Sequence, residues 1–159
     1  MKLQILISSY KRNNVGRWIT LPTTNHIISS TIEEICIDNT DKCVVTKYNS
    51  NLSLNNLDIV GYEDIYYINE LVLKLNKCAT NKKIVALVEV YSNNLEEILQ
   101  KAQRGTYKFY PNKCLKDIAE KFSTRKPYKY YDDIYRIIED LSQIGYEETS
   151  TGVIFMYEK

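Results

Sequence analysis

Apolar and polar residues alternate along two short stretches near the start of the chain, residues 2–8 and residues 15–21. A period of two is typical of a β-strand with one buried face. The polar residues 11–14 between the two stretches favour a turn. The pattern therefore predicts a hairpin, and its second strand ends at Pro22 because proline has no N–H to donate to a sheet.

The single tryptophan of the chain, Trp18, lies in the second stretch, within the sequence VGRWITLP. The alternation places Trp18 on one face of the predicted strand and both Ile19 and Leu21 on the other face. We therefore expect Trp18 to cover one face of a small sheet, as a large aromatic side chain can.

Apolar residues then recur at spacings of three and four, which predicts amphipathic helices. Residues 81–91 fit either a helix or a buried strand, and the face shared by Ile84 and Leu87 favours the helix. Asn93 and Glu96 are spaced as a capping pair for the helix that follows. The predicted helices cover residues 62–77, 81–91, 95–102, 113–122 and 132–142, with an earlier helix between the capping residues 23–25 and residue 34.

The other predicted strands are short. Residues 43–48 and residues 106–110 each form one strand, and residues 146–157 form a hairpin that turns at residues 150–152. Residues 49–56 are rich in asparagine and serine, which is typical of a surface loop.

The order of these elements predicts the fold class. Strands with one helix come first, and helices with small strands follow, which is typical of an α+β protein. We expect an elongated chain of small mixed lobes. These are an N-terminal lobe with a small sheet and a helix (residues 1–60), a helical middle lobe (61–104) and a C-terminal lobe with helix and hairpin (105–159).

Composition narrows the class of protein without identifying it. The chain is 44% hydrophobic and 26% charged, which is typical of a globular protein. Its 21 basic and 20 acidic residues give a net charge of +1. It has no apolar run long enough for a membrane span and no signal-peptide pattern, so we expect a cytoplasmic protein without membrane contact. The four cysteines show no C-x-x-C spacing, so we expect free thiols.

Residues that could carry catalysis are few. The single histidine, His26, lies at the start of a predicted helix, where an exposed cap-region residue is the simplest interpretation. The sequence has no glycine-rich phosphate loop, no serine nucleophile motif and no cysteine or histidine cluster with metal-ligand spacing. We therefore predict that the chain is not an enzyme and needs no cofactor and no metal.

Charge is distributed unevenly along this nearly neutral chain. Residues 58–70 contain four acids and no base, and residues 130–158 contain seven acids and only one base. Such acids can form a solvated helix face with local ion pairs, or a surface that binds a partner. The candidate target-binding carboxylates are Asp58, Glu63, Asp64, Glu70, Asp132, Asp133, Glu139, Asp140, Glu147 and Glu148.

Residues 101–129 have the opposite charge, with nine bases against two acids. Five aromatic residues are interleaved with them, and bases together with aromatic rings can bind single-stranded nucleic acid. The alternative, which we favour, is that the rings fill the core while the basic side chains face water. The bases are Lys101, Arg104, Lys108, Lys113, Lys116, Lys121, Arg125, Lys126 and Lys129.

Several stretches together resemble the ArdA antirestriction family. These are VGRWITLP followed by a helix, CVVTKY, GYEDIYYINELVLKL with its INEL pattern, ALVEVYSNNLEEILQKA and DIYRIIEDLSQIGYEETSTGVIFMYE. The resemblance covers nearly the whole chain in the order of its elements. It implies that Trp18 is the structural aromatic of the N-terminal lobe.

The resemblance also implies a function. Members of the family are elongated homodimers whose acidic surface mimics bent duplex DNA and occupies the DNA-binding groove of type I restriction–modification enzymes. It implies that the ten candidate carboxylates bind the target. It also implies a dimer contact in the segment 106–115, with Tyr107, Phe109 and Tyr110 as anchors.

The neutral charge of this chain departs from the acidity of the family, so we expect restricted acidic patches instead of a continuous field. We expect a non-catalytic inhibitor whose partner is a host restriction–modification enzyme or another DNA-targeting nuclease, such as a CRISPR effector complex. The second hypothesis is a nucleic-acid-binding accessory protein of a mobile element that uses residues 101–129.

Overall fold

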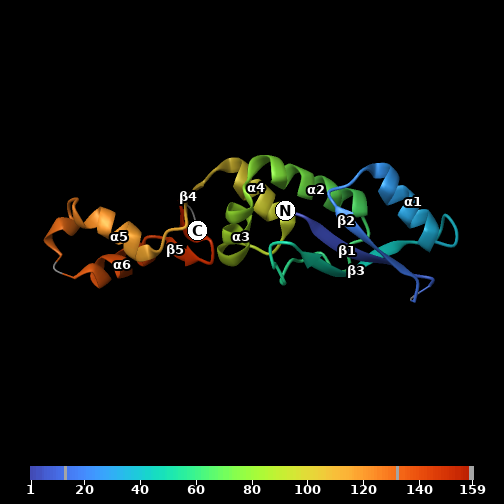
Figure 1. Cartoon of the computed structure of the whole chain (residues 1–159), viewed down its shortest axis with the longest axis horizontal. Coiled ribbons are helices and arrows are strands. Elements are labelled where there is room, and N and C mark those ends of the chain that lie inside the picture. Colours follow the sequence, from blue (N-terminus) through green and yellow to red (C-terminus); the bar gives the residue numbers. More distant parts are fainter. Residues whose placement is uncertain (13, 132, 158–159) are drawn as a thin grey trace.

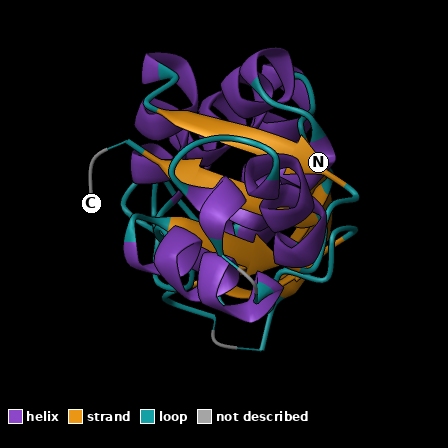
Figure 2. Ribbon diagram, turned by 90° about the vertical axis from the view of Figure 1, so that its left-hand side faces the viewer, coloured by secondary structure: helices purple, strands orange, loops and turns teal. Residues whose placement is uncertain are grey.

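The computed structural model describes residues 1–12, 14–131 and 133–157. Figure 1 shows an elongated molecule with a small sheet and a helix at one end, a group of helices in the middle and a pair of helices at the other end. Viewed from the end of its long axis, it has a roughly round outline (Figure 2). The described residues form six α-helices and two three-stranded antiparallel sheets, which confirms the α+β class.

The first sheet contains β1 (Leu3–Ser9), β2 (Gly16–Leu21) and β3 (Cys43–Ser50), in the order β2-β1-β3. The predicted hairpin is β1 and β2, which pair with Leu3 opposite Leu21. The third strand extends two residues beyond the predicted end at residue 48. Its continuation shortens the loop that the sequence predicted from residue 49.

The two faces of this sheet differ as the alternation predicted. Ile19 and Leu21 are buried, and α1 (Asn25–Ile35) packs beside β2 on their side. Trp18 points to the opposite face, directly across from Leu6, and remains 52% exposed. Trp18 therefore lies on the outer face of the sheet and does not enter the core.

Three helices form the middle of the molecule: α2 (Ile65–Cys78), α3 (Asn81–Val90) and α4 (Leu95–Arg104). Residues 81–90 are thus helical, as the shared apolar face indicated, and Tyr91 caps the helix. The second helix begins three residues later than predicted because Asp64 caps it, accepting a hydrogen bond from the Tyr67 amide at 2.9 Å.

The second sheet contains β4 (Tyr107–Pro111), β5 (Tyr146–Thr149) and β6 (Gly152–Met156), in the order β4-β6-β5. The predicted terminal hairpin is β5 and β6, and β4 joins it as a third strand that the sequence did not place there. Gly152 has a φ of 153°, and a Cβ there would collide with the Tyr110 carbonyl oxygen. A side chain at this position would therefore disrupt the pairing of β4 with β6.

The last two helices, α5 (Leu115–Ser123) and α6 (Ile134–Gln143), pack against each other and against β5. A 3₁₀ helix at Tyr128–Tyr130 lies between them in sequence. Both α-helices begin about two residues later than predicted, because capping residues precede them.

Strand β6 lies between two clusters of buried residues. Ile154 and Met156 belong to a large core with the first sheet and helices α1 to α4. Val153 belongs to a smaller core with α5, α6 and Tyr146. Successive residues of a strand point to opposite faces, so β6 connects the two cores. The lobe boundaries after residues 60 and 104 stay a prediction.

Candidate functional site

The predicted carboxylates lie mostly at the surface. Asp132 is outside the described residues, and Asp140 and Glu147 are partly buried. The seven exposed ones are Asp58, Glu63, Asp64, Glu70, Asp133, Glu139 and Glu148. They occupy two regions, the start of α2 in the middle of the molecule and the C-terminal end around α6.

Two of the middle carboxylates form ion pairs. Glu63 accepts a hydrogen bond from Lys42 Nζ at 2.8 Å, and this bond lowers the pKa of Glu63. Glu70 pairs with Lys74 at 2.6 Å, one turn further along α2. Exposed ion pairs contribute little to stability, but they reduce the net negative charge that these carboxylates present to a partner.

Helix α4 adds a further acid, Glu96, whose spacing from Asn93 had indicated only a capping role. Glu96 forms a hydrogen bond with the Tyr67 hydroxyl on α2, and this bond raises the pKa of Tyr67. The backbone N–H of Asp58 also bonds to the Asn93 carbonyl at 3.0 Å, just before α4. Only the packing of α2 against α4 brings these groups together.

We call Asp58, Asp64, Glu70 and Glu96 the middle acidic surface. Asp64 and Glu70 also line a shallow hollow of about 400 Å³ together with Tyr66 and Tyr67. Carboxylates next to tyrosine rings present both hydrogen-bond acceptors and apolar area to a protein partner.

The C-terminal carboxylates mostly hold the fold together. Asp133 caps α6 through the Tyr135 amide at 2.9 Å, and Glu148 accepts a hydrogen bond from the Leu115 amide at 2.8 Å, where α5 begins. Negative charge is favourable at these positive helix ends. Asp140 bonds to Tyr131 and raises the pKa of that phenol.

Glu139 differs from these, because it is exposed on α6 and forms no ion pair within the part of the chain that the structure describes. It is the C-terminal carboxylate best placed to meet a partner.

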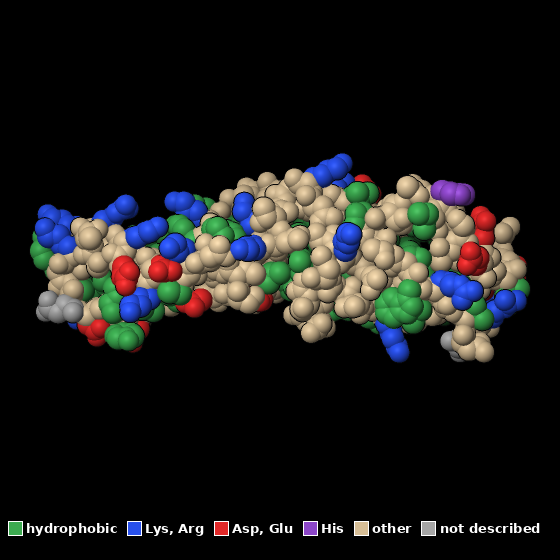
Figure 3. All heavy atoms as spheres, in the orientation of Figure 1, with side chains coloured by type: hydrophobic (Ala, Val, Ile, Leu, Met, Phe, Trp, Pro, Cys, Tyr) green, Lys and Arg blue, Asp and Glu red, His purple; other side chains and the backbone are tan. Residues whose placement is uncertain are grey.

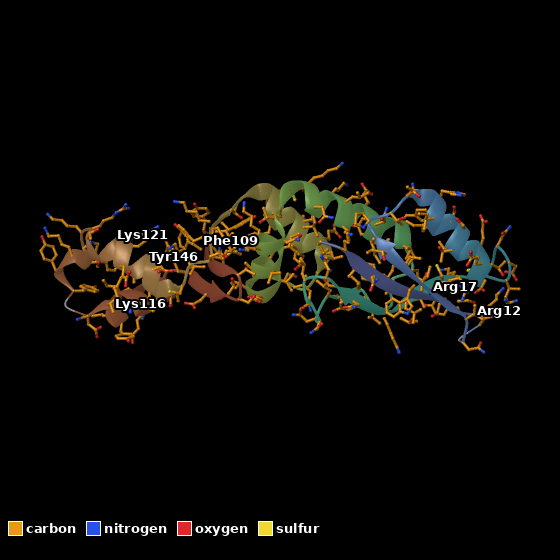
Figure 4. All side chains as sticks on the ribbon, in the orientation of Figure 1. Arg12, Arg17, Phe109, Lys116, Lys121 and Tyr146 are labelled. Atoms are coloured by element: carbon orange, nitrogen blue, oxygen red, sulfur yellow. The ribbon has the colours of Figure 1, made fainter. Side chains whose placement is uncertain are left out.

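The three residues predicted at the dimer contact all lie on β4 and are half-buried within their own chain. Tyr107 and Phe109 pack against the large core. Tyr110 packs against the smaller core, where its ring stacks on Tyr146 at 6.2 Å. Figure 4 shows Phe109 near the middle helices and Tyr146 farther toward α5. Burial and a side-chain hydrogen bond with Tyr110 raise the pKa of the Tyr146 hydroxyl.

The nine predicted bases do not form one surface. Lys101 is 93% buried, and its ammonium group lies 5.1 Å from the centre of the Tyr91 ring. Lys113 pairs with Asp117 at 4.0 Å. Figure 4 places Lys116 and Lys121 on α5 at one end of the molecule, far from Arg12 and Arg17 at the other end. Basic side chains gather at that α5 end in Figure 3.

The aromatic residues interleaved with these bases face inward. Phe122 packs edge-on against Tyr128 at 5.8 Å and against Tyr146 at 6.0 Å. Tyr110, Phe122 and Tyr128 all contact the smaller core. This arrangement agrees with the favoured alternative, in which the rings fill the core.

The other candidate chemical groups occupy ordinary positions. His26 is exposed in the first turn of α1. Cys43 is buried, and burial raises the pKa of its thiol to about 11, which keeps it protonated at neutral pH. The described residues contain no cluster of three or more metal-ligating side chains and no helix long and apolar enough to cross a membrane.

With this geometry in view, comparison with protein families gives a match over nearly the whole chain. The family model described as antirestriction protein (ArdA) matches residues 8–155. The chain belongs to the ArdA family. A search among curated proteins gave no match.

The ArdA match extends from the end of β1 into β6 and so includes parts of both sheets and all six helices described here. All ten candidate carboxylates and the three candidate dimer residues lie inside it. The family is one of antirestriction proteins, which places the chain in that general functional class.

Proposed function

We propose that the chain inhibits a type I restriction–modification enzyme without catalysis, by occupying the DNA-binding site of that enzyme. Membership of the ArdA family carries this proposal. The elongated shape in Figure 1 supports it, because a duplex-binding groove is itself long and narrow.

Charge decides how such a protein competes with DNA. Duplex DNA carries one negative charge per about 1.7 Å of its axis, whereas this chain has a net charge of +1. A continuous phosphate-like field is therefore not available. We propose that two separate regions contact the target: the middle acidic surface, and Glu139 with Asp140 on α6.

The ion pairs and helix caps formed by these carboxylates weaken their long-range attraction to the target. Glu63 and Glu70 are paired with lysines, and Asp64, Asp133 and Glu148 stabilise helix ends. Long-range attraction to a basic groove is weaker for paired charges than for free ones. We therefore expect the affinity for the restriction enzyme to depend on complementary contacts at short range more than on long-range electrostatic attraction.

We also propose that the protein forms a homodimer through β4. Within the described residues β4 pairs on one side only, with β6, and its other edge has no strand partner. Unpaired edges of this kind can add a strand from a second chain. Tyr107, Phe109 and Tyr110 would then support the contact from the two faces of the sheet.

A cleavage assay tests the inhibition. The purified protein is titrated into a type I restriction enzyme acting on unmodified plasmid DNA, and cleaved product is measured. We expect wild-type protein to block cleavage. Glu70→Lys combined with Glu96→Lys should raise the concentration for half-inhibition about tenfold, equivalent to about 1.4 kcal/mol, because lysines would face a basic DNA-binding site.

The matched control is Glu33→Lys combined with Glu34→Lys on α1, which changes the net charge by the same amount at two exposed positions outside the middle acidic surface. It should inhibit like wild type. Absence of inhibition by folded wild-type protein contradicts the proposed function. Equal loss in both double variants contradicts the assignment to the middle acidic surface.

A further inference from the structure

A group of exposed bases lies at the end of the molecule farthest from the first sheet. Two are on α5, and three follow in the segment that leads to α6. Figure 3 shows basic side chains gathered there, and Figure 4 labels the two on α5. We call this group the basic tip, and it comprises Lys116, Lys121, Arg125, Lys126 and Lys129.

These five bases are available to a ligand. All five side chains are exposed, and none forms an ion pair with another residue that the structure describes. Of the acids on α5, Asp117 is engaged by Lys113 and by the amide of Cys114. Glu120 is exposed. The tip thus presents an excess of positive charge.

An aromatic ring accompanies the bases. Tyr130 is 64% exposed, in contrast to its neighbour Tyr128, whose ring packs in the smaller core. The Lys129 ammonium group lies 5.2 Å from the centre of the Tyr130 ring. An exposed ring that does not contribute to the core is free to stack on a planar ligand.

We propose that the basic tip binds single-stranded DNA, with the bases contacting phosphates and Tyr130 stacking on an unpaired nucleobase. Proteins that bind single strands combine these two features. Duplex DNA fits the tip less well, because its bases are already stacked and leave Tyr130 unused. An acidic protein surface would likewise engage the cations but not the ring. This activity goes beyond the proposed inhibition and does not depend on it.

Fluorescence anisotropy with a labelled oligodeoxythymidylate tests the proposal, with no restriction enzyme present. We expect wild-type protein to bind the oligonucleotide at low salt and to lose affinity as salt increases. Arg125→Glu, Lys126→Glu and Lys129→Glu together should weaken binding at least about tenfold and reduce the log–log salt slope by about 2. Tyr130→Ala should weaken it about fivefold or more, without changing the slope.

The matched control reverses three exposed bases elsewhere, Lys2→Glu, Lys47→Glu and Lys77→Glu. This control should bind the oligonucleotide more tightly than the tip variant, which has the same net charge. Circular dichroism checks that all variants fold. Equal loss in both triple variants, or no binding by wild type at low salt, overturns the proposal. Binding to duplex alone that is insensitive to Tyr130→Ala overturns the assignment to single strands.

A further outcome concerns protein partners. If wild type binds neither form of DNA but the tip variant no longer associates with the restriction enzyme, the tip contacts an acidic protein surface and the proposal is wrong.

Discussion

At the scale of single residues, Asn69 shows how a polar side chain within an apolar helix face serves the fold. It is only 3% exposed, and its amide oxygen accepts a hydrogen bond from the Thr23 N–H at 2.8 Å. Its amide nitrogen donates to the Thr23 carbonyl at 3.0 Å. The two bonds join α2 to the segment after β2, and the INEL pattern alone did not indicate this contact.

Replacing Asn69 by alanine should therefore destabilise the protein. Asn69→Ala removes both bonds and leaves partly buried backbone groups of Thr23 without partners, which costs about 2–3 kcal/mol of unfolding free energy. Urea unfolding followed by circular dichroism measures the change. Asn55→Ala, in an exposed loop, serves as the control and should change stability by less than about 0.5 kcal/mol. Similar values for the two variants would contradict the role of Asn69.

At the scale of elements, the start of α4 corrects one prediction. The sequence indicated Asn93 as the cap, but Asn94 has this role, because its side chain accepts hydrogen bonds from the amides of Glu96 and Glu97. Asn93 lies outside the helix, and its carbonyl accepts the Asp58 amide instead. Local capping rules cannot choose between two adjacent asparagines. The tertiary contact with Asp58 distinguishes Asn93 from Asn94.

This difference gives a paired prediction. Asn94→Ala should lower the free energy of unfolding by about 1 kcal/mol, because the first amides of α4 lose their acceptor. Asn93→Ala keeps the backbone carbonyl and should have an effect below about 0.5 kcal/mol. Thermal or urea unfolding of the two variants measures both changes. A larger loss of unfolding free energy for Asn93→Ala than for Asn94→Ala would show that Asn93 is the cap.

At the scale of the whole molecule, charges of opposite sign occupy different surfaces. The C-terminal end carries the basic tip together with Glu139 and Asp140 of α6, whereas the middle acidic surface lies on α2, on α4 and in the segment before α2. A net charge of +1 therefore conceals local surfaces of opposite sign. Partners of different charge can bind different regions of one chain, which is the basis of both proposals.

The proposed homodimer is tested at the same scale. Light scattering of the full chain at micromolar concentration should give a mass near twice 18.6 kDa, if the free edge of β4 pairs with a second copy. Phe109→Pro should shift the mass toward the monomer, because the Phe109 N–H faces the free edge of β4, away from β6, and proline cannot donate a hydrogen bond there. A monomeric mass for wild type contradicts the dimer.

The sequence by itself determined the elements and the class of the protein. Periods of two and of three to four residues depend only on neighbouring side chains, so they predicted the hairpins, the six helices and the α+β class. The ordered stretches also supported the ArdA resemblance, which the family match confirms.

Only the tertiary structure decided which elements meet. Three features depend on contacts between distant segments: β4 joins the terminal hairpin, Glu96 lies beside the acids near α2, and Lys101 is buried. Local patterns contain no information about such contacts. For the same reason the sequence treated residues 101–129 as one basic stretch, whereas packing buries Lys101 and directs most of the aromatic rings inward. It leaves Tyr130 and the five bases of the tip exposed to solvent.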